Sequence, residues 1–240
     1  PASVPRDATR WGEMTAQQVG GRLVRRWQPV DHVAGRELIY FPGGGFVNPL
    51  ATAHWWIIRR LMTRTRAAVT IADYPLTPEH TYDQARAFVD AVYAHVADDP
   101  RTTRLFVAGD SAGGNVALSL ALRVRDERRR PIDGLILLAP WGDPTMRNPE
   151  AARLARRDPS LRGAVLRACG TEWGRSSHSS SCRVGRPDGA RVNRRAAGDD
   201  RTRAPAATEP HGADSASDQP LPAECDGGIG AARRRRRAGR

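Results

Sequence analysis

The hydrophobic residues of this chain gather in four short runs, and between the runs they recur every three or four positions. Short apolar runs rich in branched and aromatic residues and bounded by turn residues predict buried β-strands. The four runs occupy residues 37–41, 68–74, 104–108 and 133–141. The recurring pattern predicts helices over residues 52–65, 82–96 and 116–124. This alternation is what a mostly parallel sheet with helices on both faces requires.

The flanks of this region are patterned differently. Between Trp11 and Trp27 the apolar residues are sparse and roughly helical in spacing, which predicts a short helix. The run at 133–141 is apolar on both of its faces, so we expect it to be fully buried. Residues 141–161 are polar, and residues 164–169 predict one or two further helical turns.

Beyond Trp173 the pattern stops. The 67 residues 174–240 contain no Phe, Trp or Tyr and only four large aliphatic residues. Such a segment buries too little apolar surface to offset its conformational entropy, so we predict a disordered tail rich in Arg, Ala, Gly, Ser and Pro. The expected organisation is an N-terminal cap or helical segment (1–36), a partial α/β core (37–173) and the tail (174–240).

Composition narrows the possible functions. The formal net charge is +12, with all 38 basic residues being arginine, and residues 1–173 carry half of that excess. Residues 1–173 therefore have the net charge of an ordinary protein, and no groove that binds nucleic acid is expected there. Cys169, Cys182 and Cys225 have neither CxxC nor metal-ligand spacing, so no disulfide framework, metal or cofactor is expected. No long apolar run or signal-peptide core is present, so no stable membrane insertion and, by default, a cytoplasmic location are expected.

One stretch contains a candidate nucleophile. Residues 109–113 fit GxSxG, in which the glycines let a strand turn sharply into a helix and expose the central Ser111 as a nucleophile. The strand before it and the helix after it match that context. The alternative for a glycine-rich helix start is close packing on a strand or a phosphate cradle. The three glycines at 43–45, after another strand, let backbone N–H groups face a cavity without side chains in the way.

Four motifs in order carry a family resemblance. They are YFPGGGF (40–46), DYPLTPEH (73–80), GDSAGGN (109–115) and APWGD (139–143). The first is similar to the HGGG oxyanion loop and the others to DYRLAPEH, the nucleophile elbow and SPWxD of bacterial esterases and lipases in the hormone-sensitive-lipase family. Over about residues 10–173 the chain therefore resembles this family of the α/β-hydrolase fold.

The resemblance implies a serine carboxylic-ester hydrolase acting on small acyl or acetyl esters. Ser111 would be the nucleophile, and the N–H groups of Gly43, Gly44 and Ala112 would form the oxyanion hole. Pro42 stands where the family has histidine, which removes a side chain that braces the loop but keeps the glycines. Asp73, Asp110, Asp143 and His80 match structural positions of the family.

The triad acid and histidine come, in the family, from two further strands after the position of Trp173, and they stay unassigned here. His32, His54 and His95 are interpreted as surface or packing residues. His178 and His211 follow Ser111 in the family order, but neither ends a recognisable strand.

The loss of pattern inside an expected domain indicates a shifted reading frame. The alternative function is then a catalytically inactive truncated hydrolase, at most a binding or non-functional product, with an open sheet edge prone to aggregation. A third possibility is that the tail folds and returns a histidine to Ser111. The oligomeric state is left open.

Overall fold

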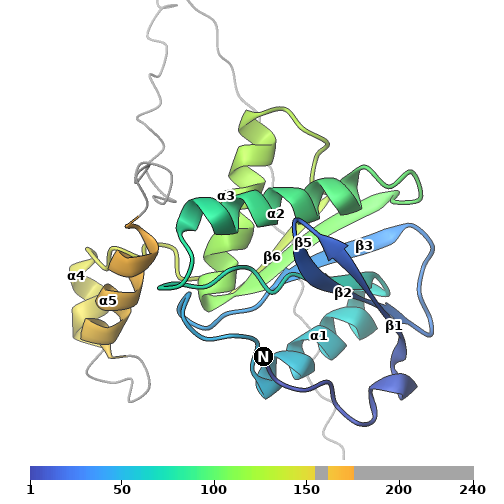
Figure 1. Cartoon of the computed structure of the whole chain (residues 1–240), viewed down its shortest axis with the longest axis horizontal. Helices are drawn as coiled ribbons and strands as arrows, with labels where there is room; N and C mark the ends of the chain where they lie inside the picture. The colour runs from blue at the N-terminus through green and yellow to red at the C-terminus, as the bar shows by residue number, and fades with distance from the viewer. Residues whose placement is uncertain (155–161, 176–240) are drawn as a thin grey trace, which may run out of the picture. The chain divides into compact units, whose positions relative to one another are not determined.

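The computed structural model describes residues 1–154 and 162–175, all of which lie in one unit of the chain, Pro1–Val192 (Figure 1). A six-stranded sheet has the order β1-β2-β4-β3-β5-β6. Its strands are β1 (Gly12–Val19), β2 (Arg22–Pro29), β3 (Arg36–Phe41), β4 (Ala68–Ile71), β5 (Arg104–Asp110) and β6 (Gly134–Leu138). The helices are the short 3-10 turn Ala8–Arg10, α1 (Thr52–Thr65), α2 (Tyr82–Ala97), α3 (Ser111–Asp126), α4 (Pro149–Leu154) and α5 (Gly163–Trp173).

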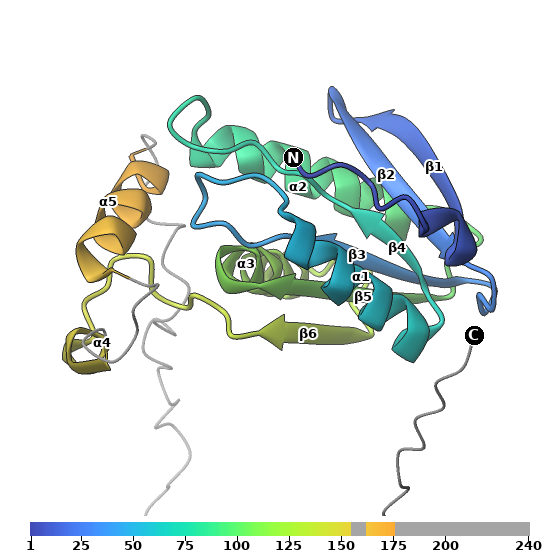
Figure 2. The ribbon, with the colours of Figure 1, turned by 90° about the horizontal axis from the view of Figure 1, so that it is seen from below.

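The centre of the sheet is parallel and covered on both faces, as predicted. β3 pairs in parallel with β4 and β5, and β5 pairs in parallel with β6. Because successive strand residues point to opposite faces, Leu38 packs with α1 while Ile39 packs with α2 and α3. Figure 2 shows α1 on one side of the sheet and α2 and α3 on the other. The α/β architecture expected for residues 37–141 is confirmed.

The helix predicted between Trp11 and Trp27 is wrong, because this segment is an antiparallel hairpin. β1 and β2 pair so that Val19 faces Arg22, and the two-residue turn Gly20-Gly21 has φ values of 55° and 76°. A turn with positive φ at both positions matches the twist of hairpin strands. Val24 and Trp27 are buried on opposite faces of the sheet, so their spacing mimics a helix. β2 then joins β4 in antiparallel pairing.

The strand predicted at 133–141 is shorter and less buried than expected. β6 spans Gly134–Leu138, and Leu135 and Leu138 are each 36% exposed. β6 ends the strand order, and within residues 1–154 and 162–175 no strand pairs with its outer edge. Full burial of β6 was expected on the assumption that a strand lies on each side of it. That expectation is wrong, because in the described residues only β5 pairs with β6.

The C-terminal predictions are tested only up to Arg175. α5 runs from Gly163 to Trp173, longer than the turns expected at 164–169, and α4 was not predicted. The predicted disorder of the tail falls almost entirely outside the described residues. No helix in the described ranges combines the length and apolar character needed to cross a membrane.

Candidate active site

Ser111 stands on the sharp turn that the glycine pattern predicts. β5 ends at Asp110, α3 begins at Ser111, and the serine has φ = 49°. This left-handed conformation is uncommon for a non-glycine residue, and such strain is concentrated at functional sites. In the parallel register Phe41 of β3 lies opposite Gly109 of β5, so the segment after β3 meets the serine turn at the carboxyl edge of the sheet.

The segment after β3 and the serine turn touch where glycines leave no side chain between them. We call residues 42–45 the glycine loop and residues 109–113 the elbow. A Cβ atom on Gly113 would lie 2.0 Å from the Phe41 carbonyl oxygen, and one on Gly43 would lie 2.3 Å from Asp110 Oδ2. Only glycine permits this approach, so the two segments fix one another's position.

The glycine loop is turned by its own backbone and held by a tyrosine. Gly44 and Gly45 have φ values of 137° and 65°, which favour glycine, and the Gly44 carbonyl accepts the Asn48 N–H at 2.9 Å. The Tyr74 hydroxyl donates to the Pro42 carbonyl at 3.0 Å. Burial, followed by the nearby carboxylates of Asp110 and Asp73, raises the pKa of Tyr74, which keeps its hydroxyl a donor. A tyrosine from the DYPLTPEH segment therefore contacts the loop where Pro42 supplies no polar side chain.

Asp110 receives three donors from three parts of the chain. Its Oδ1 accepts the Tyr40 hydroxyl at 2.5 Å and the Gly43 N–H at 2.9 Å, while Oδ2 lies 3.5 Å from His54 Nε2. Burial alone would raise the pKa of Asp110, but the hydrogen bonds from His54, Tyr40 and Gly43 outweigh it and hold the pKa below its usual range. The Gly43 N–H, expected to face an oxyanion, is thus engaged by a carboxylate in this structure.

The histidines in the described residues have partners other than Ser111. His54, expected at the surface or in packing, is only 8% exposed and lies beside Asp110. His32 Nε2 bonds to the Arg36 carbonyl oxygen, and His95 bonds to Gln17. His80 is half-buried in the turn before α2. His178 and His211 lie outside the described residues, and within those residues no hydrogen bond links a histidine to Ser111.

The remaining acidic residues have structural partners, as their motif positions suggested. Asp143 accepts hydrogen bonds from Thr145 and from the Arg147 N–H. Burial would raise the pKa of Asp143, but these hydrogen bonds lower it below its usual range. Asp73 pairs with Arg25 of β2 at 2.9 Å and so ties the hairpin to the sheet.

An aromatic cluster borders the glycine loop. Phe46, directly after the loop, stacks on Trp173 of α5 with ring centroids 4.4 Å apart and on Trp141 at 5.3 Å. Tyr74 and Tyr82 meet Trp173 edge-on. The main-chain N–H of Trp141 also donates to the Ser111 carbonyl at 2.8 Å, which joins this cluster to the elbow. The sequence pattern did not reveal this arrangement, because its members come from four distant segments.

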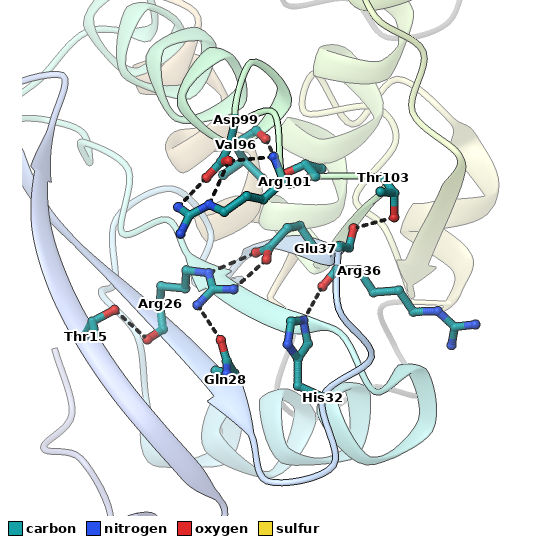
Figure 3. Close-up of polar contacts among 12 residues, drawn as sticks. Thr15, Arg26, Gln28, His32, Arg36, Glu37, Val96, Asp99, Arg101 and Thr103 are labelled. Carbon is teal, nitrogen blue, oxygen red and sulfur yellow. Dashed lines mark hydrogen bonds and ion pairs between the residues drawn. The ribbon is translucent and has the colours of Figure 1, made fainter.

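A separate polar cavity of about 530 Å³ lies toward the amino end of the parallel strands. Arg26, Gln28 and Glu37 line this cavity. Arg26 lies 2.5 Å from Glu37 Oε1 and 3.1 Å from Gln28 Oε1, and Figure 3 shows these contacts. Glu37 sits near the start of β3, whereas Ser111 follows the end of the neighbouring β5. The cavity is thus distinct from the candidate active site. In the described ranges no group of His, Cys, Asp and Glu is arranged to hold a metal ion.

Comparison with known proteins agrees with this fold. A family model described as alpha/beta hydrolase fold matches residues 38–185. LipR of Mycobacterium tuberculosis is 34% identical over 158 residues, covering 65% of this chain and 49% of LipR. Human hormone-sensitive lipase is 31% identical over 160 residues, covering 62% of this chain and 15% of the lipase.

A solved esterase/lipase from an uncultured bacterium superposes with a TM-score of 0.64 at 23% identity, covering 76% of this chain and 66% of that structure. At this identity the likeness shows the fold alone. The chain spans about half the length, or less, of the curated relatives named above.

Proposed function

The chain belongs to the α/β-hydrolase family, with relatives among esterases of the hormone-sensitive-lipase family, and from that premise we propose that it hydrolyses small carboxylic esters through Ser111. One observation carries the proposal. Ser111 has φ = 49° on the turn between β5 and α3, directly beside a glycine loop at the carboxyl edge of the sheet. This is the geometry in which a serine hydroxyl is exposed to a carbonyl group.

The reaction would be acyl transfer in two steps. Ser111 Oγ attacks the ester carbonyl carbon as a base removes its proton, and the tetrahedral intermediate expels the alcohol, which takes up that proton. Water then attacks the acyl carbon, the bond to Ser111 Oγ breaks, the carboxylic acid leaves and a proton returns to Oγ. The amides of Gly44 and Ala112 are proposed to stabilise the oxyanion, while the Gly43 amide is held by Asp110. Removing one such donor typically lowers the rate by about 10²–10³.

The proposed reaction requires a base that takes the proton of Ser111. A serine hydroxyl is a weak nucleophile at neutral pH without a hydrogen-bonded base. His178 and His211 are the histidines that follow Ser111 in the chain. The second candidate is an inactive member of the family. It is motivated by the loss of strand pattern after Trp173, where the family's triad acid and histidine are expected.

The decisive experiment compares hydrolysis of p-nitrophenyl acetate and butyrate by the full chain with that by Ser111→Ala. We expect Ser111→Ala to fall to the background rate. Ser119→Ala is the matched control, because Ser119 is a buried serine two turns further along α3 and is not placed in the site. This control is expected to keep the wild-type rate. Equal rates for the wild type and Ser111→Ala would reject the enzyme and leave the inactive member.

A further inference from the structure

We propose that the Asp110 carboxylate is a positioning residue that fastens the glycine loop to the elbow, and so sets the geometry of the proposed oxyanion hole. This inference rests on the proposed ester hydrolysis through Ser111. It assigns a role to three side chains, Tyr40, His54 and Asp110, that the proposed reaction itself leaves unused.

The contacts join separate elements at one carboxylate. Tyr40 comes from the end of β3, Gly43 from the glycine loop and His54 from the first turn of α1. Asp110 adjoins Ser111 in the chain. The carboxylate therefore connects the glycine loop, one strand and one helix to the residue next to the nucleophile.

Each of the three neighbours presents a donor. His54 Nδ1 accepts the Ala51 N–H at 2.7 Å, which leaves the proton of a neutral imidazole on Nε2, the atom facing Asp110. Burial, then the hydrogen bond to Asp110 and its charge, raises the pKa of Tyr40, so its hydroxyl also remains a donor. The Gly43 amide can only donate.

An ionised carboxylate is the side chain that satisfies this arrangement. Aspartate offers two accepting oxygens, whereas asparagine of the same size offers one oxygen and an NH₂ group. In Asp110→Asn the NH₂ group would face either His54 Nε2–H or the pair of donors from Tyr40 and Gly43. Either orientation removes one of the two accepting oxygens while the volume of the residue stays the same. Asp110→Ala removes both oxygens, and with them the acceptor of the Gly43 N–H.

The hydrogen bond from Gly43 to Asp110 acts directly on the backbone that forms the proposed oxyanion hole. No side chain separates Gly43 from Asp110, since a Cβ on Gly43 would lie 2.3 Å from Oδ2. The Gly43 amide is one peptide unit from the Gly44 amide. Releasing Gly43 is thus expected to misorient Gly44, one of the two proposed oxyanion donors.

The first test measures amide hydrogen exchange in the full chain, and it does not require catalysis. In Asp110→Ala we expect the Gly43 amide to exchange at least about tenfold faster than in the wild type, because its acceptor is gone. Asp133→Ala is the matched control, because Asp133 also accepts a backbone N–H, that of Leu105 at the other end of β5. It should leave Gly43 unchanged. Unchanged exchange at Gly43 in Asp110→Ala would overturn the proposal.

The second test is kinetic. We expect Asp110→Ala to lower kcat for p-nitrophenyl acetate by about 10²–10³ with KM within about threefold, because orientation of the donors matters in the transition state. Asp133→Ala should retain the wild-type kcat. Faster exchange at Gly43 with unchanged kcat would reject the positioning role. An inactive wild type would reject the proposed ester hydrolysis and the positioning role built on it, while the exchange test still decides whether Asp110 fastens the loop.

Discussion

Gly113 shows how one missing methyl group fixes the candidate site. It lies inside α3, where alanine is ordinarily favoured over glycine by about 1 kcal/mol. Here the Cβ of an alanine would meet the Phe41 carbonyl oxygen at 2.0 Å and the Pro42 carbonyl carbon at 2.7 Å. Close packing of the elbow on the end of β3 therefore outweighs helix propensity.

We predict that Gly113→Ala lowers the free energy of unfolding by about 1–3 kcal/mol, because the backbone of the elbow or the glycine loop must shift. Urea denaturation at neutral pH measures the change. Gly142→Ala is the control, since a Cβ there meets no atom within 4 Å. If Gly113→Ala were as stable as this control, the close approach of α3 to the strand end would be wrong.

At the same scale, local motifs predicted Ser111 and the glycines but not the partners of Asp110. The turn residues are adjacent in the chain, so a short pattern contains them. Tyr40 and Gly43 reach Asp110 across separations of 70 and 67 residues. Such pairings have no local signature, and they become visible only when β3 and β5 are placed side by side.

The elements of the core were predictable wherever both ends of a strand were marked by turns. β3, β5 and the helices that follow β3, β4 and β5 lie where apolar runs and helical spacing placed them. The hairpin was missed because β2 buries residues on both faces of the sheet, which obscures the alternation of a half-exposed strand. The adjacent glycines Gly20 and Gly21 were the signal that could have identified it.

Helix α5 is anchored by Trp173, and the contribution of this side chain to stability can be tested. Trp173 is 2% exposed and stacks on Phe46, so Trp173→Ala should lower the free energy of unfolding by about 3–5 kcal/mol. Trp56→Ala is the control, since Trp56 of α1 is 79% exposed. Its effect should stay within about 0.5 kcal/mol. Thermal or urea denaturation compares the two, and equal effects would contradict the packing of α5 on Phe46.

For the molecule as a whole, two aspartates make stability depend on pH in opposite directions. Hydrogen bonds lower the pKa of folded Asp110 despite its burial, so its contribution is present above the unfolded pKa of about 3.9 and is lost as pH falls through the folded value. Burial raises the pKa of Asp73 despite Arg25, so its contribution is present at low pH and is lost as pH rises through the folded value.

Urea denaturation between about pH 2 and pH 6 should separate these contributions. In Asp110→Asn the free energy of unfolding should rise less steeply with pH than in the wild type. In Asp73→Asn it should rise more steeply, because the opposing contribution has been removed. Slopes that changed in the same direction in both variants would contradict the environments described for these carboxylates.

The parallel pairing of β3, β4, β5 and β6 followed from the order of the elements, whereas the exposure of the edge strand β6 did not. Burial of β6 depends on what lies beside it, and its own apolar residues cannot reveal whether a neighbour is present. The 36% exposure of Leu135 and Leu138 therefore had to come from the structure.

The fastening at Asp110 also bears on the order in which the protein takes shape during synthesis. Tyr40 and Gly43 leave the ribosome long before Asp110, and β3 can pair with β4 before β5 has been made. Until residue 110 emerges, the glycine loop lacks the carboxylate that holds it. Contacts this distant in sequence form late and slowly. The glycine loop therefore cannot acquire this contact until Asp110, 67 residues after Gly43 in the chain, has been synthesised.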